Sequence, residues 1–123
     1  VLIPKHRSCP LSATVAKTSA GAVEHVPVAR VGNLVQTIKK LKQEGLWVAA
    51  ADMDGKDYYD TDLTGPLLLI IGSEGQGVGS LVKEQCDFVV RIPMVGKINS
   101  LNASVAGSIL MYEAMKQRRK ALN

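Results

Sequence analysis

The sequence has little of what marks several common protein classes. Its two cysteines, Cys9 and Cys86, lie far apart, which gives neither a disulfide scaffold nor a metal-binding spacing. Aromatic residues make up only 4% of the chain, too few for a surface that stacks unpaired bases. Apolar runs such as Leu67–Ile71 are strand-sized, well short of a membrane helix. No signal peptide is recognisable. We therefore expect a cytoplasmic protein with no membrane partner and no metal.

The overall composition and length indicate one globular domain. The chain has 123 residues, of which 46% are hydrophobic and 21% are charged, values typical of folded proteins and unlike those of disordered chains. We expect residues 1–123 to form a single domain, because this length fits one domain and leaves no room for two. The net charge of +4 permits a nucleic-acid partner without requiring one.

Apolar runs alternate with segments of helical periodicity. We expect strands at 1–3, 26–31, 46–51, 66–71 and 88–92, and helices at 12–22, 33–45, 80–85 and 101–121. Strands that are apolar throughout are buried on both faces, which predicts an α/β fold with a mostly parallel sheet and helices on both faces. Ligands of such sheets bind beyond the carboxyl ends of the strands, so the loops after Ile71 and Ile92 are candidate binding segments.

Some finer features are also predicted. Asn33 and Gln36 form a capping-box pattern at the start of one helix, and Gly45 is a stop signal at its end. Residues 52–65 are interpreted as an acidic loop, and Trp47 as a core residue. One side of the last helix carries the apolar residues Leu101, Val105, Ile109, Tyr112 and Met115.

The glycine-rich loop GSEGQGVG at 72–79 permits several interpretations. A Walker phosphate loop needs a Gly-Lys-Ser/Thr end, which is missing. Gly75, Gly77 and Ser80 approximate a Rossmann fingerprint, but no acidic residue follows about twenty positions later to hold a ribose. A third possibility is close backbone approach to a ligand that is not a phosphate, such as the adenosyl part of a methyl donor. A plain connection is the commonest explanation for glycines alone.

A second cluster follows at PMVG (93–96) and SLNASVA (100–106). Ser100 and Asn102 stand at a predicted helix start, where capping residues and exposed backbone N–H groups gather. Taken alone, an N-cap is a commoner explanation for them than a functional site.

The two clusters together, followed by a helix that reaches YEA at 112–114, resemble the SpoU-TrmH family of the SPOUT superfamily. Its members are S-adenosyl-L-methionine-dependent RNA ribose 2'-O-methyltransferases. The resemblance covers essentially the whole chain, and residues 16–28 are similar to the bacterial branch that methylates a guanosine of 23S ribosomal RNA. It implies S-adenosyl-L-methionine as cofactor, an RNA substrate (rRNA rather than tRNA), a homodimer, and a C-terminal deep trefoil knot.

The resemblance also assigns roles to individual residues. It implies that Gly72, Ile92 and Leu101 bind the cofactor, largely through backbone atoms. It further implies that the catalytic residues near the reacting ribose are the following three: Glu74, Ser100 and Asn102.

The chain departs from the family pattern in two places. The family's catalytic arginine lies on a strand-helix unit that would precede Val1, and this unit is missing here. The resemblance therefore implies an N-terminally truncated catalytic domain that is inactive by itself. Ala51 stands where relatives often have a hydroxyl residue.

Two alternatives to a methyltransferase stay open. The missing arginine motif is also consistent with a non-catalytic dimeric module that binds the cofactor or RNA. A nucleotide-binding α/β domain is disfavoured by the missing Walker lysine and ribose carboxylate.

Overall fold

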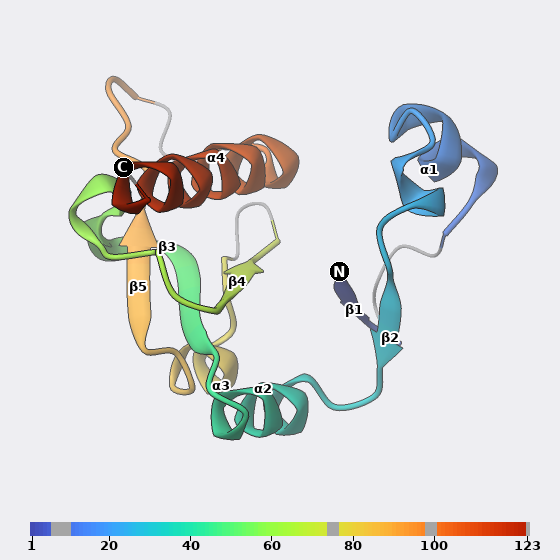
Figure 1. The fold of residues 1–123 in the computed structure, drawn as a ribbon, viewed down its shortest axis with the longest axis horizontal. Coiled ribbons are helices and arrows are strands. Elements are labelled where there is room, and N and C mark those ends of the chain that lie inside the picture. Colours follow the sequence, from blue (N-terminus) through green and yellow to red (C-terminus); the bar gives the residue numbers. More distant parts are fainter. Residues whose placement is uncertain (6–10, 74–76, 98–100, 123) are drawn as a thin grey trace. The chain divides into compact units, whose positions relative to one another are not determined.

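The computed structural model describes residues 1–5, 11–73, 77–97 and 101–122. The described chain divides into two compact units, residues 1–37 and 38–123, which are treated separately below (Figure 1). In chain order the strands and longer helices are β1 (Leu2–Pro4), α1 (Ala13–Thr18), β2 (Ala29–Val31), α2 (Leu34–Gln43), β3 (Trp47–Asp57), β4 (Leu67–Ile71), α3 (Ser80–Lys83), β5 (Phe88–Arg91) and α4 (Ala103–Ala121). Short 3-10 helices lie at Ala22–Glu24 and Tyr58–Asp60.

The first unit contains a two-stranded parallel sheet of β1 and β2. The predicted strand at 26–31 begins only at Ala29, because Pro27 has no N–H to donate to a sheet. The predicted helix at 12–22 is shorter than expected and ends at Thr18. Two residues later Ala20 has a φ of 52°, which a right-handed helix does not allow.

Helix α2 begins and ends as its sequence predicts. The side chain of Asn33 accepts a hydrogen bond from the Gln36 N–H at 3.0 Å, which confirms the N-cap. At the other end Gly45 has a φ of 100°, and the Leu46 N–H donates to the Leu41 carbonyl at 3.2 Å. This arrangement is a Schellman ending, which satisfies carbonyls that the helix leaves free.

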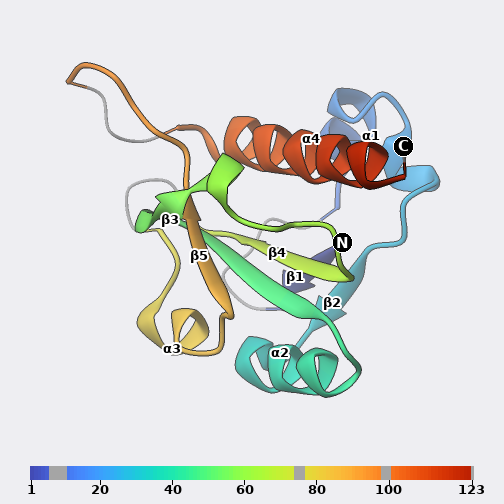
Figure 2. The same cartoon turned by 60° about the vertical axis from the view of Figure 1, so that its left-hand side comes forward.

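The second unit contains a three-stranded parallel sheet in the order β4-β3-β5. The central strand β3 pairs with β4 from Trp47↔Leu67 to Ala51↔Ile71. Helix α4 lies on one side of the strands, and α3 lies on the other side with the last residues of α2 (Figure 2). These features confirm the predicted parallel sheet with helices on both faces.

Strand β3 is longer than predicted, because it continues into the segment interpreted as a loop. After a register shift, Lys56 pairs with Val90 and Asp57 with Arg91. A Cβ atom at Gly55 would lie 2.3 Å from the Val89 carbonyl oxygen. Only glycine permits this approach, so the acidic segment 52–57 can run beside β5. The prediction of a loop over residues 52–65 was therefore wrong for its first part.

The core of the second unit lies between the sheet and α4. A cluster there joins Ala49 of β3, Ala114 of α4 and Leu63, with partly buried apolar side chains packed against it: Leu67, Leu69 and Phe88. The predicted apolar side of α4 is not its buried face, since Tyr112 is 77% exposed. The helix instead buries Gly107, Leu110, Glu113 and Ala114.

The structure corrects two predictions about bulky side chains, one on α4 and one at Trp47. Gly107 faces the Ile71 side chain, which lies 3.6 Å from the position of a Cβ atom at Gly107, so the buried face of α4 is the one that meets β4. Trp47, predicted as core, is 52% exposed. It stands at the start of β3, where its ring packs against Phe88 with centroids 5.9 Å apart. In the described part of the chain, no helix is long and apolar enough to cross a membrane.

Candidate functional site

A cavity of about 300 Å³ lies in the second unit, at the carboxyl ends of β4 and β5 and beside the middle of β3, where β3 stops pairing with β4. Its walls come from β3, β4, β5, the loop after β4 and the start of α4. The lining residues are Ala51, Asp52, Met53, Ile71, Gly72, Ser73, Gly77, Val90, Arg91, Ile92, Met94, Leu101, Ala103 and Ala106. This is the edge of a parallel sheet at which ligands bind, as the sequence predicts.

The structure brings together the three residues predicted to bind a cofactor. Gly72 follows β4, Ile92 follows β5 and Leu101 precedes α4, yet all three line this cavity. Parallel pairing places the ends of β4 and β5 on either side of β3. Three segments that are distant in sequence therefore share one cavity wall.

The predicted catalytic residues are placed less fully. Glu74 and Ser100 lie outside the described residues. Asn102 is the N-cap of α4: its Oδ1 accepts hydrogen bonds from the Ser104 N–H at 2.9 Å and from the Ser104 hydroxyl at 2.6 Å. The N-cap interpretation of Asn102 is confirmed, and its catalytic role stays a prediction.

The loop after β4 folds tightly back on itself. The Gly77 N–H donates to the Ser73 carbonyl at 2.9 Å. A Cβ at Gly72 would lie 2.1 Å from the Gly77 carbonyl carbon, so backbone is packed directly against backbone. The cavity wall here consists of peptide groups, which offer hydrogen-bond donors and acceptors without charge.

Asp52 is a charged residue of the cavity that the sequence analysis did not single out. Lys83 on α3 places its Nζ 3.4 Å from Asp52 and 2.6 Å from Asp54. The hydrogen bond between Lys83 and Asp54 lowers the pKa of Asp54 and raises the pKa of Lys83. The available signal was an aspartate directly after a buried strand, at the edge where ligands bind.

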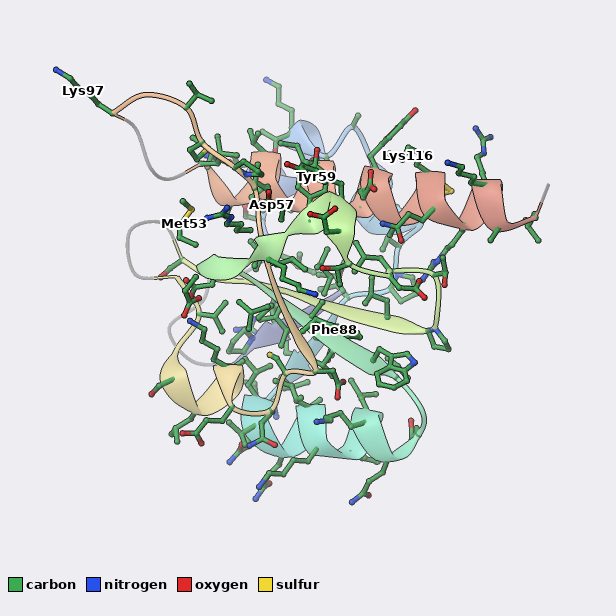
Figure 3. All side chains as sticks on the ribbon, turned by 90° about the vertical axis from the view of Figure 1, so that its left-hand side faces the viewer. Met53, Asp57, Tyr59, Phe88, Lys97 and Lys116 are labelled. Atoms are coloured by element: carbon green, nitrogen blue, oxygen red, sulfur yellow. The ribbon has the colours of Figure 1, made fainter. Side chains whose placement is uncertain are left out.

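A second ion pair lies at the β5 side of the cavity. Arg91, a lining residue, pairs with Asp57, and Asp57 also accepts a hydrogen bond from the Tyr59 hydroxyl at 3.0 Å. Figure 3 shows Asp57, the last residue of β3, close to Tyr59. The bond to Arg91 lowers the pKa of Asp57, while the bond to Asp57 raises the pKa of Tyr59. The register shift of β3 creates this pair, because it brings Asp57 opposite Arg91.

The described residues contain no group of three His, Cys, Asp or Glu side chains able to hold a metal ion.

Comparison with known proteins establishes the family. Residues 1–112 match the model of the SpoU rRNA Methylase family. The chain belongs to this family. A Staphylococcus haemolyticus protein that is named a TrmH family tRNA/rRNA methyltransferase is 56% identical to this chain over 121 residues. The match covers 98% of this chain and 49% of that protein. The similarly named YacO of Bacillus subtilis is 52% identical over 96% of this chain and 48% of its own length. The chain thus spans about half the length of these SpoU relatives.

Solved structures of SpoU proteins share the fold. The SpoU methyltransferase AviRb of Streptomyces viridochromogenes, solved with the cofactor AdoMet, is 29% identical with a TM-score of 0.88, over 97% of this chain and 49% of AviRb. A TrmH/SpoU tRNA modifying enzyme from A. aeolicus is 28% identical with a TM-score of 0.84, over 98% of this chain and 63% of that one. These likenesses confirm the α/β architecture with parallel strands.

Proposed function

We propose that this chain is the catalytic domain of an S-adenosyl-L-methionine-dependent RNA ribose 2'-O-methyltransferase. The observation that carries the proposal is the cavity wall shared by Gly72, Ile92 and Leu101 in a member of the SpoU family. When bound, S-adenosyl-L-methionine supplies an activated methyl group. We further propose a guanosine of large-subunit rRNA as the target, a homodimer as the assembly, and a knotted C-terminal segment.

The cavity has the properties that an adenosyl group requires. A volume of about 300 Å³ suits a small ligand. Ile71, Ile92 and Leu101 supply apolar walls for a base, and the backbone around Gly72 supplies polar atoms for its edges. Gly72 and Gly77 approach tightly, so this part of the wall exposes backbone atoms of the loop.

The protein's own contribution is to orient the ribose 2'-hydroxyl in line with the methyl group and to favour loss of its proton. We assign the positioning of ribose and loop to Glu74, Ser100 and Asn102. The arginine that family members use for proton removal has no counterpart at a matching position in residues 1–123. We therefore propose that turnover requires the strand-helix unit that carries this arginine.

Binding is the first test of this function. Calorimetric titration with S-adenosylhomocysteine should give a one-site curve, and Leu101→Asp should abolish binding because it puts a charge on an apolar cavity wall. Leu81→Asp is the matched control, since Leu81 lies on α3, is 68% exposed and does not line the cavity. Absence of binding, or equal loss with both variants, would contradict the cofactor assignment.

Methyl transfer is the second test. The protein carrying the strand-helix unit is incubated with labelled S-adenosyl-L-methionine and with large-subunit rRNA or tRNA. Label at a ribose makes the adjacent phosphodiester resistant to alkali, because the attacking 2'-hydroxyl is blocked. We expect alkali-resistant label in rRNA at a guanosine. Label in a base, or in tRNA alone, would contradict the proposed specificity.

A second candidate is a dimeric module that binds the cofactor or RNA without chemistry. Tight binding without any transfer in the extended protein would favour this module over the methyltransferase.

A further inference from the structure

Asp52 holds a carboxylate against the glycine loop at the cavity. It follows Ala51, the last residue of β3 to pair with β4, and it lines the cavity. A Cβ at Gly77 would lie 3.1 Å from the Asp52 Oδ2 atom, so the carboxylate occupies the space next to the loop backbone. The side chain is 22% exposed, which leaves it accessible to a ligand in the cavity.

Lys83 compensates the charge of Asp52 without using up its hydrogen-bonding capacity. Its Nζ lies 2.7 Å and 2.6 Å from the two carboxylate oxygens of Asp54. The same Nζ lies farther from Asp52, at 3.4 Å from its Oδ2 atom. A carboxylate has about four acceptor positions, so Asp52 can accept further hydrogen bonds. An ionised acceptor makes stronger bonds than a neutral one.

The chemistry of these groups selects a ligand with neutral donors. A phosphate next to Gly77 would be repelled by the Asp52 carboxylate. Two adjacent hydroxyl groups fit instead, because each donates to one carboxylate oxygen, as ribose hydroxyls do at acidic residues of nucleoside sites. Ile71, Ile92 and Leu101 line the same cavity and supply apolar contacts for the base of the same nucleoside.

We infer that Asp52 is a specificity-determining residue that binds the 2'- and 3'-hydroxyls of the cofactor's ribose, with Lys83 holding the carboxylate in place. The inference rests on the proposed function, because it takes the ligand of this cavity to be an adenosyl compound. It explains why a glycine-rich loop at the end of a strand serves a nucleoside and not a phosphate.

A thermodynamic cycle that removes either the Asp52 carboxylate or one ribose hydroxyl tests this assignment. The affinities of S-adenosylhomocysteine and of its 2'-deoxy and 3'-deoxy analogues are measured by calorimetry with the unaltered protein, Asp52→Asn and Asp54→Asn. Asp52→Asn should lower the affinity for S-adenosylhomocysteine by about tenfold or more, which is the usual effect of losing hydrogen bonds to a charged group. The deoxy analogues should bind the unaltered protein more weakly than S-adenosylhomocysteine does, by a similar factor. Asp52→Asn should lower the affinity for these analogues little further, because the hydrogen bond is already lost.

The control variant and the analogues separate the possible outcomes. Asp54 shares Lys83 but is absent from the cavity wall, so Asp54→Asn should leave every affinity within about threefold. If Asp52→Asn weakens all ligands equally, the residue acts by packing and the inference is overturned. Equal affinity of the unaltered protein for S-adenosylhomocysteine and both analogues overturns it even if Asp52→Asn does not fold. Failure of the unaltered protein to bind S-adenosylhomocysteine at all would instead reject the proposed function.

Discussion

The backbone N–H of Leu63 donates a 2.8 Å hydrogen bond to the side-chain oxygen of Gln117. The amide nitrogen of Gln117 donates in turn to the Thr61 carbonyl at 3.0 Å and to Glu113 at 3.1 Å. One side chain of α4 thus fixes the segment that leads into β4, and Leu63 is only 1% exposed. The loop after β4 forms a cavity wall, so this contact supports the site indirectly.

Gln117→Leu should lower the free energy of unfolding by about 1–3 kcal/mol, because it leaves the partly buried Leu63 N–H and Thr61 carbonyl without their partner. Denaturant unfolding monitored by circular dichroism measures the change. Gln43→Leu, on an exposed position of α2, is the matched control and should stay within about 0.5 kcal/mol of the unaltered protein. Equal stabilities of the two variants would contradict the role of Gln117.

Gly72→Ala should abolish S-adenosylhomocysteine binding and lower the thermal midpoint. The new Cβ would lie 2.1 Å from the Gly77 backbone, which cannot move aside as a flexible side chain can. Gly79→Ala is the control: its Cβ meets nothing within 4 Å, and its φ is −62°. That change should preserve binding and alter stability by less than about 1 kcal/mol, because the lower chain entropy of alanine is offset by its weaker N-capping of α3. Undiminished binding by Gly72→Ala would show that the loop adopts another conformation.

Substitutions of Asn102 can separate capping from catalysis. Asn102→Ala should cost about 0.5–2 kcal/mol of stability, since it removes the N-cap of α4. Asn102→Ser retains a capping oxygen and should remain nearly as stable as the unaltered protein. If Asn102 also positions the ribose, the Ser variant should lose methyl transfer by about 10²-fold, the effect of removing one aligned polar group. Full transfer by the stable Ser variant would restrict Asn102 to capping.

Glu113 should make the fold sensitive to acid. Burial, the largest single influence, raises its pKa, but the hydrogen bond from Gln117 and the contact with Lys116 at 3.0 Å together lower it below the ordinary value. A lowered pKa in the folded state stabilises the protein above the unfolded-state pKa of glutamate. This stabilisation is lost as the pH falls through the lower, folded-state value.

Thermal unfolding between pH 7 and pH 3 measures this effect, because this range spans the ordinary carboxylate pKa of roughly 4. Glu113→Gln should reduce the fall in the unfolding midpoint on acidification, whereas Glu84→Gln, an exposed position, should leave it unchanged. An identical acid profile for the unaltered protein and Glu113→Gln would assign the sensitivity to other carboxylates.

Local features account for the elements that the sequence predicts correctly. The N-cap at Asn33 and the stop at Gly45 involve atoms within a few residues of each other, so the pattern contains all the participants. The apolar runs that become β4 and the first half of β3 are equally local. The cavity position follows from them, because ligands of a parallel sheet bind at the carboxyl ends of its strands.

The errors of prediction concern residues whose environment is set by distant segments. Acidic residues with a glycine are typical of a loop, yet Gly55 lets this segment pass β5 as a strand. The apolar residues of α4 lie on more than one side of the helix, and only the packing of α4 against the sheet shows that Leu110 is buried and Tyr112 is exposed. Trp47 is the first residue of β3 and is half exposed, which its apolar sequence neighbours do not reveal.

The sequence by itself determined the family, the parallel α/β sheet and the membership of Gly72, Ile92 and Leu101 in a candidate site, because motifs and hydrophobic periodicity are encoded over short stretches. Only the tertiary structure decided which charges meet at that site. Lys83 reaches Asp52 and Asp54 across about thirty residues, and Arg91 reaches Asp57 through a shifted register. Such pairs depend on how strands and helices pack, and the shape of the packed surfaces is a property of the whole unit.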